Sequence, residues 1–115
     1  MIKRQNDYTT ERKENMRGGD GAVMLTELLK PAELSEKGRL CAILTLEPGA
    51  SIGYHVHENE MEIYYILNGV AEYTDNGEVF KLYPGDTTLT PSGEGHTVRN
   101  AGDSPLELLA LILYA

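Results

Sequence analysis

Three histidines and one glutamate are the residues of this sequence whose types and spacing best suit chemistry. His55 and His57 stand two residues apart, and Glu62 and His96 follow them along the chain. Residues two apart on a β-strand point to the same face, so the two imidazoles of the pair should converge on one point. The chain has no other histidine. Imidazole nitrogens together with a carboxylate oxygen predict a site for one divalent metal ion.

Glu62 opens the run EIYYIL, whose alternation places Glu62, Tyr64 and Ile66 on one face. A carboxylate among apolar neighbours loses its hydration, at a cost of roughly several kcal/mol, unless a cation compensates its charge. His96 lies on a separate strand, and we expect it to approach from the opposite wall of the site. That approach requires a sheet that closes into a barrel.

The elements that must position these residues are short β-strands. From Gly21 onward, β-type runs alternate with turn residues, and no helical apolar period is sustained. Asp75-Asn76-Gly77 predicts a tight type I′ hairpin, because Asn and Gly accept positive φ angles. Many strands at close spacing are typical of an all-β sandwich or barrel. The expected strands are residues 22–29, 39–47, 51–57, 61–67, 70–75, 78–83, 87–90, 96–100 and 106–114.

The length of 115 residues indicates a single globular domain. We expect an N-terminal arm over residues 1–19 and a barrel domain over residues 20–115. Residues 1–17 carry five basic and three acidic groups, whereas residues 18–115 carry five basic and fifteen acidic ones. Such an arm is either a flexible, solvated tail or a segment that packs on a partner subunit. The sequence leaves both alternatives open.

Charge and hydropathy restrict the partners. A net charge of −8 repels phosphate backbones, so we expect no nucleic acid partner. No run approaches the roughly 18 apolar residues that span a membrane, and the N-terminal residues lack the apolar stretch of a signal peptide. We therefore expect a cytoplasmic protein. Residues 39–46 and 106–114 are largely apolar on both faces. Either the arm or a second copy must cover their outer faces, and we expect a homodimer.

The histidine segment resembles the first motif of the cupin family: Gly, five residues, His-X-His, four residues, Glu, six residues, Gly. The second cupin motif is Gly, five residues, Pro-X-Gly, two residues, His, three residues, Asn. Together the two motifs cover residues 49–100. The residues at the motif positions are Gly49, His55, His57, Glu62 and Gly69, then Gly85, Pro91, Gly93, His96 and Asn100.

The resemblance to cupins implies a double-stranded β-helix, the jelly-roll barrel, with a metal held by the three histidines and the glutamate. This donor set suits Mn, Fe, Ni, Co and Zn and excludes the all-oxygen coordination of calcium. Cupins with this complete donor set resemble oxalate decarboxylases, dioxygenases and acyl- or sugar-processing enzymes. The resemblance implies manganese or iron, and we expect manganese. The function hypothesis is a metal-dependent enzyme acting on a small oxygenated substrate, as a dioxygenase, decarboxylase or isomerase. The alternative is a non-catalytic module that binds a small molecule or a metal.

Tyr64 is the candidate catalytic residue, because it shares the face of Glu62 and could serve as acid, base or hydrogen-bond donor. The alternative is a core tyrosine whose hydroxyl is satisfied within the fold. Three further acids, in the loops that flank the ligands, should be solvated: Glu58, Glu60 and Glu94.

Arg99 has the opposite strand parity to His96 and should point away from the site. No arginine that could clamp a doubly charged substrate is evident in the sequence. This absence favours a substrate that is singly charged or neutral.

Overall fold

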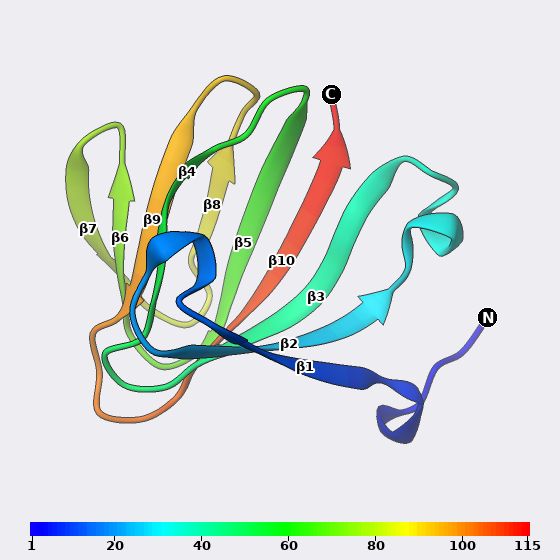
Figure 1. Ribbon diagram of the computed structural model, residues 1–115, viewed down its shortest axis with the longest axis horizontal. Coiled ribbons are helices and arrows are strands. Elements are labelled where there is room, and N and C mark those ends of the chain that lie inside the picture. The colour runs from blue at the N-terminus through cyan, green and yellow to red at the C-terminus, as the bar shows by residue number, and fades with distance from the viewer.

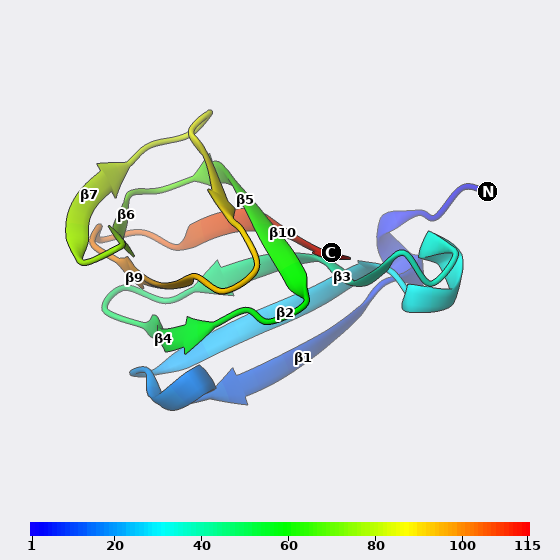
Figure 2. The same cartoon turned by 90° about the horizontal axis from the view of Figure 1, so that it is seen from above.

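Ten β-strands form two antiparallel sheets that wrap around a common interior, as Figures 1 and 2 show for the computed structural model of residues 1–115. One sheet has six strands in the order β1-β2-β3-β10-β5-β8, and the other has four in the order β4-β9-β6-β7. None of the helices has the length and apolar composition needed to cross a membrane. The strands are β1 (Thr9–Glu14), β2 (Ala22–Leu29), β3 (Gly38–Leu46), β4 (Ser51–Val56), β5 (Glu60–Asn68), β6 (Ala71–Asp75), β7 (Glu78–Leu82), β8 (Thr87–Thr90), β9 (Gly95–Asn100) and β10 (Leu106–Tyr114), and the short 3-10 helices are η1 (Gln5–Asp7), η2 (Met16–Gly18) and η3 (Pro31–Leu34).

The expected all-β fold is confirmed, and the nine expected strands lie within one residue of the observed bounds at each end. The hairpin between β6 and β7 turns at Asn76 and Gly77, whose φ angles are 50° and 81°. Asp75 then pairs with Glu78 across the turn. The Asn-Gly signal works here because both central residues of a type I′ turn need positive φ.

Strand β1 has no counterpart among the strands expected from the sequence. This strand, TTERKE, pairs antiparallel with β2 from Thr9 opposite Glu27 to Glu14 opposite Ala22. Its side chains are polar and mostly exposed, so the apolar alternation that marks a strand in sequence is missing. The strand forms because the edge of β2 offers unpaired backbone groups. Residues 9–14 therefore pair within their own chain, and η2 follows them beside β4 (Figure 1).

The hydrophobic core lies between the two sheets. Along β10, buried and half-buried residues alternate, and Leu108 and Ala110 contribute their side chains to the core. The opposite side of the six-stranded sheet is also apolar, and several of its side chains are exposed. We call this side the outer face of the six-stranded sheet. It carries Ile43, Ile63, Tyr65, Leu89, Leu109 and Leu111, which the strand register places side by side.

Candidate metal centre

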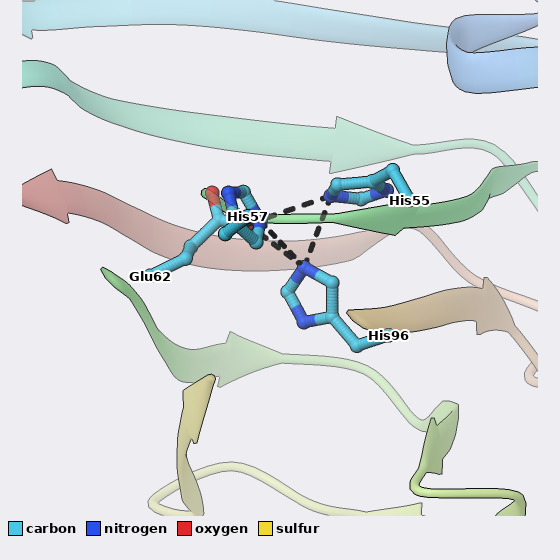
Figure 3. Close-up of side chains that lie close together, drawn as sticks. All are labelled: His55, His57, Glu62 and His96. Carbon is cyan, nitrogen blue, oxygen red and sulfur yellow. Dashed lines mark hydrogen bonds and ion pairs between the residues drawn. The ribbon is translucent and has the colours of Figure 1, made fainter. Parts of the chain in front are cut away.

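Four side chains from three strands point toward one another between the sheets (Figure 3). His55 lies in β4 and His57 directly follows that strand, while Glu62 lies in β5 and His96 in β9. His55 and His96 are direct cross-strand partners in the four-stranded sheet. The expectation that His96 comes from the opposite wall was therefore wrong. Glu62 is the residue that reaches across from the other sheet, and closure of the sheets brings it to the histidines.

The donor atoms are spaced as adjacent ligands of a single ion would be. Glu62 Oε1 lies 3.0 Å from His57 Nε2, 2.9 Å from His96 Nε2 and 3.7 Å from His55 Nε2. His96 Nε2 also lies 3.1 Å from His57 Nε2 and 3.0 Å from His55 Nε2. Ligands that meet at a right angle about 2.1 Å from a metal ion are about 3 Å apart. The four residues thus need no large movement to hold an ion.

The second ring nitrogen of both His55 and His57 is held by an acceptor. His55 Nδ1 lies 2.8 Å from the carbonyl oxygen of Gly53, and His57 Nδ1 lies 2.7 Å from Glu60 Oε2. A carbonyl and a carboxylate can only accept, so both Nδ1 atoms carry the proton and donate it. The Nε2 lone pairs then point at the centre of the cluster, which is how metal-binding histidines are usually oriented.

The centre of the cluster is suited to a positive charge. Glu62 is only 3% exposed, and its Oε1 atom is buried without a hydrogen-bond partner. Burial raises the pKa of the Glu62 carboxyl, whereas imidazoles that carry a proton on their inner nitrogen oppose burial and lower that pKa below its ordinary value. A buried anion that faces imidazole lone pairs is destabilised unless a cation lies between them. The residues present therefore fit a divalent metal ion.

The protonation of the histidines is consistent with this fit. Glu62, followed by Glu60, raises the pKa of His57 against the opposing effect of burial. Burial lowers the pKa of His96 and keeps that ring neutral, as a metal ligand must be. In the metal-free protein a proton on His57 can partly compensate Glu62, and a metal ion would have to displace that proton.

Glu60 is part of the site, which the sequence analysis missed. Its carboxylate accepts from Arg39 Nε at 2.8 Å and from Arg39 Nη2 at 2.9 Å, besides accepting from His57. The Arg39 guanidinium holds the pKa of Glu60 below its ordinary value. The expectation of a solvated loop residue was wrong for Glu60. The one available signal was its position three residues after His57, which lets a carboxylate fold back onto the ring.

Tyr64 forms one wall behind His96. The two rings stack at a centroid distance of 5.0 Å and an interplanar angle of 19°. Burial, and after it the charge of Glu62, raises the pKa of Tyr64 well above its ordinary value, so the phenol keeps its proton. His96 Nδ1 lies 2.8 Å from the hydroxyl of Tyr73 and 2.9 Å from Thr90 Oγ1. All three histidines are thus anchored on the side away from the centre of the cluster.

A cavity of about 310 Å³ opens beside the cluster and is bounded by His55, His57, Glu62 and Tyr64. Its rim carries the cationic residues Lys13, Arg17 and Arg39. No arginine near the site was evident in the sequence, but two arginines distant in sequence from the ligands, Arg17 and Arg39, line the cavity. Arg99 does point away, as expected, and pairs with Asp20 Oδ2 at 2.7 Å.

Comparisons with known proteins agree on one family. A family model described as "Cupin domain" matches residues 42–112. The Oxalate-binding protein of Thermotoga maritima is 45% identical over 113 residues, which cover 98% of this chain and 93% of that protein. The crystal structure of a predicted oxalate decarboxylase from Thermotoga maritima matches with a TM-score of 0.96 and 44% identity over the full length of both chains. Oxalate decarboxylase OxdC of Bacillus subtilis is 36% identical over 75 residues, which are 61% of this chain and 20% of that protein.

Proposed function

This chain belongs to the cupin family, and from that premise we propose that it holds one divalent metal ion in the four-residue cluster and captures a small carboxylate anion beside it. The observation that carries the proposal is the buried oxygen of Glu62, which has no hydrogen-bond partner and faces three imidazole nitrogens. The bound metal would act as a Lewis acid that stabilises negative charge on the ligand. Manganese is the proposed ion, and Fe, Ni, Co and Zn are the alternatives.

Three observations support an anion of the oxalate class. Two similar proteins carry oxalate in their names, and one of them is similar over nearly the whole chain. The cavity of about 310 Å³ lies at the small end of the range for ligand pockets, about 300–1,000 Å³. Its cationic rim suits a negatively charged ligand.

The cavity favours binding over acid–base catalysis. Glu62 is the one carboxylate that lines the cavity, and the two histidines that line it, His55 and His57, belong with Glu62 to the proposed metal cluster. Tyr64 keeps its proton because its pKa is raised, so it can donate a hydrogen bond or a proton but makes a poor base. We therefore place the non-catalytic binding module ahead of the enzyme. A dioxygenase, decarboxylase or isomerase that uses Tyr64 as its acid is the second candidate.

Titration calorimetry with oxalate tests the proposal. Protein loaded with Mn²⁺ should bind one oxalate per chain, and protein stripped with a chelator should bind it at least about tenfold more weakly, because the anion loses its contact with the metal cation. Elemental analysis gives the metal occupancy of each sample. Equal binding with and without metal, or no binding by either, would contradict the proposal. Oxygen uptake or CO2 release by the loaded protein would promote the second candidate.

We also propose that the outer face of the six-stranded sheet joins two copies of the chain in a homodimer, which would remove exposed apolar surface from water. Tyr65 lies opposite Leu109 on this face and is 42% exposed, while Phe80 on β7 is 46% exposed and lies in the other sheet. Sedimentation equilibrium should give a dimer mass for the wild type and for Phe80→Glu but a monomer mass for Tyr65→Glu. A monomeric wild type, or equal masses for both variants, would refute the interface.

A further inference from the structure

Among the three cationic residues that line the cavity, Arg17 is the one whose side chain has no partner within the protein. Arg39 is engaged by Glu60 through two hydrogen bonds. The Nζ atom of Lys13 lies 3.4 Å from Glu11 Oε2. The guanidinium of Arg17 has no ion pair and no hydrogen bond to any other residue, although Arg17 lines the same cavity as the proposed metal ligands. A cation left without a partner at the mouth of an anion site is available to a ligand.

The turn that carries Arg17 is packed directly onto β4. A Cβ atom at Gly53 would lie 2.1 Å from the carbonyl oxygen of Arg17, and a Cβ atom at Gly19 would lie 2.1 Å from the carbonyl oxygen of Ser51. Both positions therefore require glycine, since any side chain would push the turn away. The carbonyl of Gly53 also anchors the ring of His55. The placement of Arg17 and the orientation of a proposed metal ligand thus depend on the same residue.

The backbone of the turn is held in an unfavourable conformation. Arg17 has φ 54° and ψ 30°, and Asn15 has φ 51°. This left-handed region is sterically disfavoured for arginine, whose side chain, unlike that of asparagine, does not readily hydrogen-bond its own backbone there. Hydrogen bonds fix the turn nevertheless. The side-chain amide of Asn15 donates to the Gly19 carbonyl at 3.0 Å, and the backbone N–H of Ser51 donates to the Asp20 carbonyl at 2.8 Å. Strain that surrounding contacts maintain is typical of functional positions.

Charge balance indicates what Arg17 meets. With neutral histidines, the Glu62 carboxylate and a divalent ion leave a net charge of +1 at the centre. A monocarboxylate brings this charge to zero, whereas a dicarboxylate leaves a net −1 in a partly enclosed cavity, where such an excess is unfavourable. Arg17 supplies the missing positive charge, and its planar guanidinium matches a carboxylate.

We propose that Arg17 is a specificity-determining residue that pairs with the second negative charge of a metal-bound dicarboxylate and so selects dianions over monoanions. This inference rests on the proposed function, because it assumes an anion captured beside a metal. It assigns the N-terminal turn a direct role in ligand recognition.

The test compares two ligands of two carbons each, oxalate with two negative charges and glycolate with one. Titration calorimetry is performed on Mn²⁺-loaded wild type, Arg17→Asn and Arg12→Gln. Asparagine removes the charge and tolerates the left-handed backbone, so Arg17→Asn should fold. Arg12 is exposed, lies outside the cavity and pairs with Glu14, so Arg12→Gln makes the same change in net charge elsewhere on the N-terminal segment.

Arg17→Asn should bind oxalate about tenfold or more weakly than wild type, the factor expected for loss of a charge-assisted hydrogen bond. Its glycolate affinity and its metal content by elemental analysis should stay within about threefold of wild type, since the metal site is untouched. Arg12→Gln should match wild type for both ligands. Equal losses for the two ligands, or none, would overturn the role of Arg17 while leaving the proposed function intact. A wild type that binds neither ligand would overturn both.

Discussion

His57→Ala should lower the metal content of the purified protein by about tenfold or more, since even the loss of a residue that only supports a ligand costs 10–100-fold in affinity. His57 Nε2 lies 3.1 Å from His96 Nε2 and 3.0 Å from Glu62 Oε1, so it is a neighbour of two other donors. The barrel should remain folded, because the hydrophobic core cluster does not include His57. Elemental analysis and circular dichroism measure the two effects.

Thermal unfolding provides a second measurement on the same variant. A ligand present at a thousandfold excess over its dissociation constant stabilises the native state by about 4 kcal/mol. Adding a chelator should therefore lower the midpoint of wild-type unfolding and leave that of His57→Ala nearly unchanged. Glu58→Ala is the matched control, because Glu58 is the exposed neighbour of His57. An unchanged metal stoichiometry in His57→Ala would show that the four side chains do not form the metal site.

Glu60→Gln should weaken metal binding by roughly 10–100-fold although Glu60 is not one of the four clustered donors. The carboxylate orients the His57 ring by accepting from its Nδ1 atom at 2.7 Å, while Arg39 grips both carboxylate oxygens. A glutamine has one acceptor oxygen, so it cannot keep both contacts to Arg39 and the contact to His57. Competition with a chromophoric chelator measures the change in affinity.

Glu58→Gln is the control for this variant, because it removes the same charge two residues away in an exposed position. If both variants lose affinity equally, the effect comes from net charge alone. If neither does, the Glu60 carboxylate has no part in positioning His57. Restored affinity in Glu60→Asp would show that the carboxylate itself, and not the exact side-chain length, is what the ring requires.

The sequence was informative wherever a local rule sets the geometry. The two-residue spacing of His55 and His57 placed both on one face, and the alternation after Glu62 correctly put Tyr64 and Ile66 on its buried side. The Asn76-Gly77 turn followed from backbone sterics alone. These rules act over a few residues, so one strand and its turn contain all the information needed.

Features that depend on distant segments could not be derived in this way. Which wall carries His96 depends on the order of strands in the four-stranded sheet, and no single strand encodes that order. Arg17 and Arg39 are far in sequence from the ligands and reach the cavity only through packing. The strand Thr9–Glu14 has no apolar alternation, because its partner strand and not its side chains determines its conformation.

The position of β10 limits how this protein can be made. Figure 1 shows β10 between β3 and β5, which both precede it along the chain. During synthesis, β3 and β5 therefore emerge from the ribosome before β10. Until β10 emerges, one edge of each strand has unpaired backbone N–H and C=O groups. Residues 106–114 must leave the exit tunnel before the six-stranded sheet is continuous. Because Glu62 lies on β5, opposite Ile112 of β10, the nascent chain cannot hold this carboxylate in its final place until synthesis has passed the last strand.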